Sequence, residues 1–239
     1  MEPQLQWNVF GFVVNADTMI FSWVSMVIVF ILFRLAARKA SVERPKGVQN
    51  VIELAFEFVN GFIRENVNDE QGRRIFRLLV SLLLYLLVVN IFSLLPFPFM
   101  HAAAADFNQT LALATIVFVL IHAYGIVYRG ARGHAKNFTL PLWPLTPINM
   151  MEAITNPLTL AMRLFGNIFA GDLLMGIAGG IVPATAAISV GFGVAFVASV
   201  VIQVAVLGFN TFIAIVQSYI FMMLTLAYVS QSMKPVGEH

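Results

Sequence analysis

The chain has 239 residues, of which 59% are hydrophobic and 11% are charged, and its formal net charge is +2. Soluble domains contain roughly 25% charged residues, and several apolar runs in this chain reach the roughly 20 residues that a helix needs to cross a bilayer. The composition therefore excludes a soluble globular protein and predicts one membrane domain over residues 1–239. The lack of cysteine excludes disulfides and thiolate metal sites.

The first predicted membrane span covers residues 19–38. No Lys or Arg precedes it, so it lacks the basic start of a cleavable signal peptide. A basic cluster lies at its end and just after it, namely Arg34, Arg38, Lys39, Arg44 and Lys46. This order is typical of a retained span whose N-terminus lies outside.

Residues 47–66 are predicted to form an amphipathic helix along the inner membrane interface. Apolar side chains recur there at helical spacing, at Val48, Val51, Ile52, Ala55, Phe56, Val59, Phe62 and Ile63, and polar residues fill the other positions. The alternative is a short soluble helix that covers a loop.

Two further spans are predicted over residues 76–95 and 109–128. Three arginines precede or begin the first of them, and Pro96 and Pro98 end it. The second is followed by Arg129, Arg132, His134 and Lys136. Residues 139–147, rich in Pro and Trp, are interpreted as a segment that re-enters the interface.

Two long helices complete the prediction, over residues 148–182 and 186–233, with a turn near Pro183. At 1.5 Å per residue both are longer than the hydrocarbon core of roughly 30 Å, so they must be strongly tilted, bent or partly outside it. The predicted fold class is an all-α integral membrane protein with five membrane helices and one interfacial amphipathic helix, the last two membrane helices being long and strongly tilted.

The basic residues predict the orientation of these spans. Of the 14 Lys and Arg residues, all except Arg163 lie in segments 34–77 and 129–136 or at Lys234. The predicted outer segments, 1–18, 96–109 and the turn near 183, contain none. Because cytoplasmic loops carry the excess of Lys and Arg, five spans with a cytoplasmic C-terminus are expected.

Arg163 lies near the middle of the fourth span. Placing an arginine there costs roughly 2.5–3.5 kcal/mol or more, and its guanidinium stays protonated. The acids at membrane depth are Glu152, on the same helix face but roughly 16 Å away by helical rise, and Asp172, on the opposite face. We therefore expect a partner protein or water to supply the counter-charge. The alternative is an arginine buried in an internal ion pair.

Polar side chains follow one face of each long helix. They are Asn149, Glu152, Asn156, Arg163 and Asn167 on the first helix, and Ser199, Gln203, Asn210, Gln217 and Tyr228 on the second. Such stripes mark a hydrated or helix-facing side, although ordinary interhelical hydrogen bonds are an alternative. An acid toward each side of the membrane, with a fixed cation between them, suggests two separate half-pathways for an ion. Asn90, His101 and His122 are interpreted as structural.

Two sequence runs resemble a known family. Residues 156–172, Asn-Pro-Leu-Thr-Leu-Ala-Met-Arg-Leu-Phe-Gly-Asn-Ile-Phe-Ala-Gly-Asp, resemble the signature of subunit a of F-type ATP synthases. Residues 217–225, Gln-Ser-Tyr-Ile-Phe-Met-Met-Leu-Thr, resemble that family's last helix. The resemblance covers essentially the whole chain, and its Arg-Leu-Phe-Gly-Asn form fits bacterial and chloroplast members better than animal mitochondrial ones.

The resemblance implies a proton-translocating stator subunit of the membrane sector, without a catalytic site, cofactor or metal of its own. Its implied partners are the c-subunit ring, the b-subunit peripheral stalk, the rest of the ATP synthase and the lipid bilayer, with no nucleic acid. Arg163 matches the family's essential arginine, which meets each c-ring carboxylate and separates two offset half-channels, and Asn167 and Gln217 match residues close to it. The implied location is a bacterial plasma membrane, with the thylakoid as the alternative.

This sequence departs from the family pattern at two places. The family often has Glu or His at the position of Asp172, paired with His or Glu at the position of Asn210, whereas only Asp172 titrates here, so waters would bridge the gap. Many members have an acid at the position of Asn149, which Glu152 is expected to replace. The expected ion pathway comprises Glu152, Asn149, Asn156, Asn167, Asp172, Gln203, Asn210 and Gln217.

Two other functions compete with this interpretation. A secondary ion transporter or self-contained ion channel predicts an internal charge pair, repeat symmetry or a substrate cavity, and the sequence reveals none of these. A non-conducting membrane scaffold would leave Arg163, Glu152 and Asp172 as an uncompensated cost.

Overall fold

The computed structural model describes residues 6–9, 12–38, 47–67, 69–94, 106–139, 143–186 and 192–233. Within them the chain forms β1 (Gln6–Val9), β2 (Phe12–Asn15), α1 (Ala16–Arg38), α2 (Val48–Asn66), α3 (Asp69–Ser93), α4 (Phe107–Asn137), the 3-10 helix η2 (Trp143–Leu145), α5 (Thr146–Ala186) and α6 (Phe192–Met233). In this described part, all the helices except α2 and η2 are long and apolar enough to cross a membrane. The predicted fold class is thereby confirmed.

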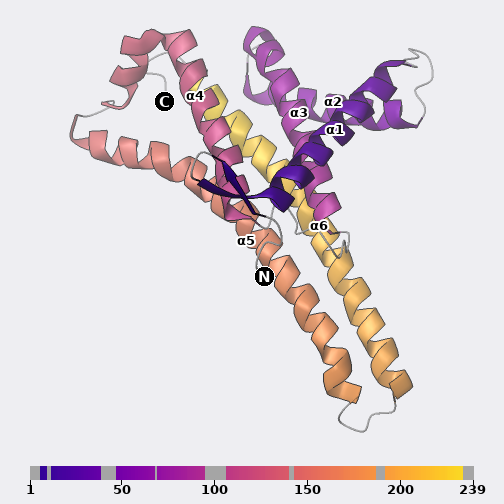
Figure 1. Ribbon diagram of the computed structural model, residues 1–239. Coiled ribbons are helices and arrows are strands. Elements are labelled where there is room, and N and C mark those ends of the chain that lie inside the picture. The colour runs from indigo at the N-terminus through magenta and orange to yellow at the C-terminus, as the bar shows by residue number, and fades with distance from the viewer. Residues whose placement is uncertain are drawn as a thin grey trace.

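The last two helices dominate the shape of the molecule. Figure 1 shows α5 and α6 side by side, extending together well beyond the other helices. They have 41 and 42 residues, which corresponds to roughly 60 Å each. α5 continues through Pro183 to Ala186, and α6 begins at Phe192 rather than at residue 186. A proline can kink a helix without ending it, and the connection between the two helices lies outside the described residues.

Several helices extend past the predicted spans. α3 begins at Asp69 and α4 continues to Asn137, whereas the expected spans began at residue 76 and ended at residue 128. Hydropathy reports only the part of a helix that lies in hydrocarbon, and polar turns can continue the same helix into the interface. In α4 the continuation is interrupted at Gly130, whose φ of 72° and ψ of 159° are not helical.

A short antiparallel hairpin precedes α1, and no pattern in the sequence predicted it. Gln6 lies opposite Asn15 and Val9 opposite Phe12. Asn15 Nδ2 donates to Asp106 Oδ2 at 2.7 Å, and Asp106 also caps α4 by accepting from the Asn108 N–H at 2.9 Å. A single carboxylate therefore ties the N-terminal segment to the start of α4.

Two groups of buried side chains hold the helices together. One joins α2, α3 and α6 and includes Val59, Leu79 and Leu226. The other joins α3, α4, α5 and α6 through Leu86, Val117, Leu160, Leu164 and Phe221. Because Leu160 and Leu164 are fully buried, they fix the rotation of α5 about its own axis.

The amphipathic helix α2 packs along one side only. Ile52, Val59 and Ile63 are buried against the bundle, whereas the side chains of Val51 and Leu54 are 60% and 66% exposed. An exposed apolar edge of this kind suits a helix in the membrane interface, where lipid covers it.

Candidate functional site

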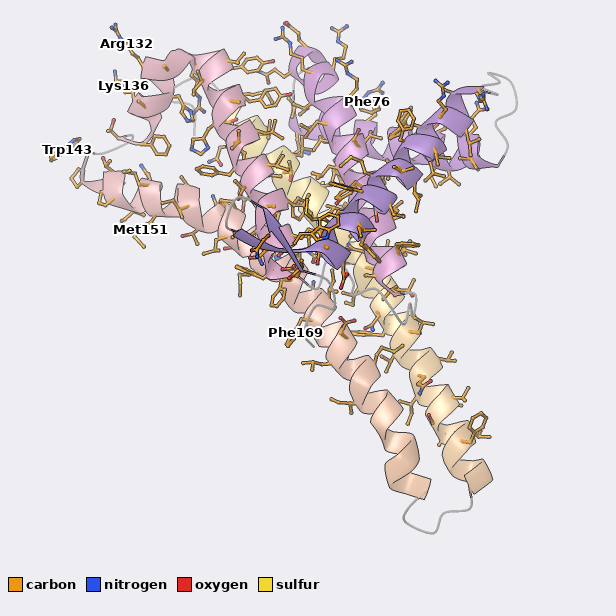
Figure 2. All side chains as sticks on the ribbon, in the orientation of Figure 1. Phe76, Arg132, Lys136, Trp143, Met151 and Phe169 are labelled. Carbon is orange, nitrogen blue, oxygen red and sulfur yellow. The ribbon has the colours of Figure 1, made fainter. Side chains whose placement is uncertain are left out.

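Arg163 lies on the outward side of α5. Its side chain is exposed, whereas Leu160 and Leu164, three residues before it and one after it, are buried. Among the residues that the structure describes, none forms a hydrogen bond or an ion pair with the guanidinium of Arg163. Figure 2 shows Met151 and Phe169 projecting from α5 where no other helix covers them. The neighbouring Met162 is likewise 51% exposed.

A large cavity lies between α4, the first half of α5 and the end of α6. Its volume is about 390 Å³, and it brings together the predicted residues Asn149, Glu152 and Asn156. The side-chain amide of Asn149 donates to the Phe138 carbonyl at 2.9 Å. Other polar groups in the wall come from α4 and α6, namely His122, Arg129, His134, Tyr228, Gln231 and Ser232. This large cavity therefore has polar walls on three sides.

One hydrogen bond joins α4 to α6 across the wall of the large cavity. Arg129 Nη2 donates to the backbone carbonyl of Gln231 at 2.6 Å, across 102 positions of sequence. The bond ties the end of α6 to α4, and because a charged donor strengthens it, it helps to fix the cavity's shape.

A small cavity lies between α3, the middle of α5 and the middle of α6. Its volume is about 20 Å³, and it brings together the predicted residues Asn167, Asp172, Asn210 and Gln217. Asn167 Nδ2 donates to Gln217 Oε1 at 2.7 Å. Asn210 Nδ2 donates to the Gly171 carbonyl at 3.2 Å. A Cβ at residue 171 would lie 3.1 Å from the Asn210 amide, so glycine permits this close approach of α5 to α6.

The small cavity also contains polar atoms that have no hydrogen-bond partner in the described part of the chain. Asn90 Oδ1 and Gln217 Nε2 are covered and have no hydrogen-bond partner among the described residues. Asn90 is 1% exposed, and its Nδ2 donates to Ser218 Oγ at 3.0 Å. This hydrogen bond fits the interpretation of Asn90 as structural. Asn90 also lines the small cavity, where its Oδ1 is unpaired among the described residues.

Arg163 contributes to neither cavity wall. Along α5 it falls between Asn156, the last polar residue of the large cavity, and Asn167, the first of the small cavity. The polar stripe expected from the sequence is therefore divided: one part faces α4, another faces α3 and α6, and Arg163 lies between them.

Among the predicted ion-pathway residues other than Arg163, Gln203 is the one that lines neither cavity. Its Nε2 lies 3.4 Å from Ser199 Oγ, one turn earlier on α6. Sequence reasoning also missed Ser93, Arg129, His134 and Gln231 as cavity residues. Their positions depend on how α3, α4 and α6 pack against α5, and this packing leaves no periodic signal in the sequence. His101 lies outside the described residues.

Comparison with known proteins matches the chain to one family. Residues 19–230 match the family described as ATP synthase A chain. A protein named ATP synthase subunit a from Staphylococcus saprophyticus is 36% identical over 242 residues, covering 98% of this chain and 97% of that protein. The proteins of the same name from Desulforamulus reducens and Staphylococcus aureus are 32% and 35% identical, and alignment to them covers 98% and 99% of this chain, and 85% and 98% of those proteins.

Proposed function

Because the chain belongs to the family of subunit a of F-type ATP synthases, we propose that it is the stator subunit that carries protons to and from a c-subunit ring. It is a multi-pass bacterial membrane protein, and its resemblance to the family covers the full length. The observation that supports the proposal is the pair of cavities on α5, one containing Glu152 and the other Asp172, with Arg163 between them.

In this proposal each cavity is one half-channel. The large cavity lies toward the cytoplasm, next to the basic end of α4, and the small cavity lies toward the outside. A proton reaches the ring through one half-channel and leaves through the other after the ring has turned. Arg163 prevents a direct leak, because a fixed positive charge repels hydronium at the junction.

The c-ring carboxylate supplies the counter-charge that Arg163 lacks in the described part of this chain. A guanidinium and a carboxylate form a strong, directional pair when water is scarce. Exposed apolar side chains line the uncovered faces of α5 and α6, including Leu158 and Met162 near Arg163 and Val204 and Phe212 on α6. Helices of the ring would pack against this surface.

The remaining partners and the orientation complete the proposal. In this proposal the chain has no catalytic or nucleotide site of its own, and ATP is made or split elsewhere in the enzyme. The b subunits of the peripheral stalk help to anchor the chain to the rest of the enzyme. The N-terminus lies outside and the C-terminus in the cytoplasm of a bacterial plasma membrane, as the distribution of Lys and Arg indicates.

The decisive experiment replaces Arg163 with Ala in the complete enzyme. ATP-driven proton pumping into inverted membrane vesicles should fall to background. Without Arg163, no fixed positive charge at the junction stabilises the deprotonated form of a ring carboxylate. The matched control is Thr159→Ala, an exposed residue one turn earlier on α5, which should pump at the normal rate. Normal pumping by the Arg163→Ala enzyme would contradict the proposal.

A further inference from the structure

The end of α4 folds back and places an imidazole in the wall of the large cavity. Gly130, with its positive φ, breaks the helix, so that the last turn returns toward α4. There the ring of His134 packs against Gly125, where a Cβ would collide with Nδ1 and would lie 2.6 Å from Cε1. Two glycines therefore permit this placement of a single side chain.

The His134 ring is enclosed by aromatic neighbours. Its centroid is 5.2 Å from that of His122 and 5.4 Å from that of Phe138, and both pairs meet edge to face. Both ring nitrogens are covered, and neither has a hydrogen-bond partner among the described residues. An imidazole always carries at least one N–H, and a ring with only a packing role is expected to pair it.

The charged and titratable groups that line the large cavity together with His134 come from three helices. They are His122 and Arg129 from α4, Glu152 from α5 and Tyr228 from α6. The shared cavity of about 390 Å³ has room for several water molecules, each of which occupies roughly 30 Å³ in the liquid. Histidine is the side chain whose ordinary protonation range lies nearest to neutral pH. His134 thus lines the same hydratable space as Glu152, the acid of the proposed inner half-channel.

Resting on the function proposed above, we propose that His134 is a proton-exchanging residue of the inner half-channel, which passes protons between the cytoplasm and Glu152. The ring takes a proton at one nitrogen and releases one from the other, so that its charge is restored after each transfer. His122 lies beside it as the second imidazole of the cavity wall. The role matters most when protons are scarce, because water alone then supplies the cavity too slowly.

The test measures ATP-driven pumping by the complete enzyme in inverted vesicles, whose outer face is the cytoplasmic one. His134→Ala should pump near the normal rate at pH 6.5 and about tenfold more slowly at pH 8.5, where hydronium is about 100-fold scarcer. Added imidazole should restore the rate at pH 8.5, because it fits the space that the side chain vacates. His134→Phe, which keeps an aromatic ring, should show the same pH-dependent deficit. Gly125→Ala, which displaces the ring, should also reproduce it.

The control is Lys136→Ala, an exposed charge in the same turn that lies outside the cavity wall and should leave the pH profile unchanged. A normal rate for His134→Ala and His134→Phe at both pH values would overturn the inference. So would an equal loss at both pH values that imidazole does not relieve, since that is the signature of a structural role. Arg163→Ala distinguishes failure of the proposed function from failure of this inference. Normal pumping by Arg163→Ala refutes the proposed function, whereas normal pumping by the His134 variants refutes only the role of His134.

Discussion

The two acids of the proposed ion pathway lie in cavities of very different size. Asp172 lines about 20 Å³ and Glu152 about 390 Å³. The small cavity has room for about one water molecule and the large cavity for several, so a carboxylate should be harder to bypass in the small cavity. We expect Asp172→Asn to slow pumping by about tenfold or more, equivalent to about 1.4 kcal/mol in the barrier, and Glu152→Gln to cost clearly less. Initial rates of ATP-driven pumping in inverted vesicles measure both.

Asp106 provides the matched control for Asp172. It is an acid outside both cavities, where it accepts hydrogen bonds from Asn15 and from the Asn108 N–H. Asparagine caps a helix about as well as aspartate, although its single oxygen cannot also accept from Asn15. Asp106→Asn should pump normally, because the hydrogen bond that it loses lies outside both cavities. Equal losses from Asp172→Asn and Glu152→Gln would show that cavity size does not determine which acid is essential.

Sequence reasoning could propose candidate site residues but not how the fold groups them. Arg163 is conspicuous because every other basic residue follows the topology, and the helical angle places Asn149, Glu152 and Asn167 on its side of α5. The helical angle between residues cannot reveal which neighbouring helices cover this face. In the structure α4 covers its first part, and α3 and α6 cover the part that follows. His134 escaped notice because its position depends on the backbone conformation of Gly130.

At the level of elements, the close contact of α2 with α3 depends on Gly72. A Cβ at residue 72 would collide with Cγ2 of Ile63, a branched side chain that is 3% exposed and has little freedom to move. Gly72→Ala should therefore destabilise the fold by about 1–3 kcal/mol through overpacking. Titration of the purified protein with SDS in mixed micelles, followed by loss of helix, gives the change in the free energy of unfolding.

Gly61 on α2 is the control for this substitution. No other group lies within 4 Å of a Cβ built there, and alanine is favoured over glycine in a helix interior by roughly 1 kcal/mol. Gly61→Ala should therefore leave stability unchanged or raise it slightly. A stabilising Gly72→Ala would mean that α2 can move away from α3 at no cost.

The helices could be predicted and the hairpin could not, for a physical reason. Runs of apolar residues long enough to cross a membrane are visible in the sequence alone. An isolated two-stranded hairpin is marginal in water, and β1–β2 gains support from the bond between Asn15 and Asp106, which are 91 positions apart. No local pattern around residues 6–15 contains that information.

For the whole molecule, the distribution of Lys and Arg leads to an orientation that can be measured directly. The chain has no cysteine, so one introduced thiol reports its own position. Asn108→Cys, at the exposed start of α4, should react with a membrane-impermeant maleimide in intact spheroplasts, and Lys136→Cys, at the other end of the same helix, only in inverted vesicles. The wild-type chain, purified after each reaction, sets the background. If both positions reacted from the same side, α4 would not cross the membrane. The reverse pattern would place the large cavity and His134 on the outside, and the direction of both half-channels would then have to be exchanged.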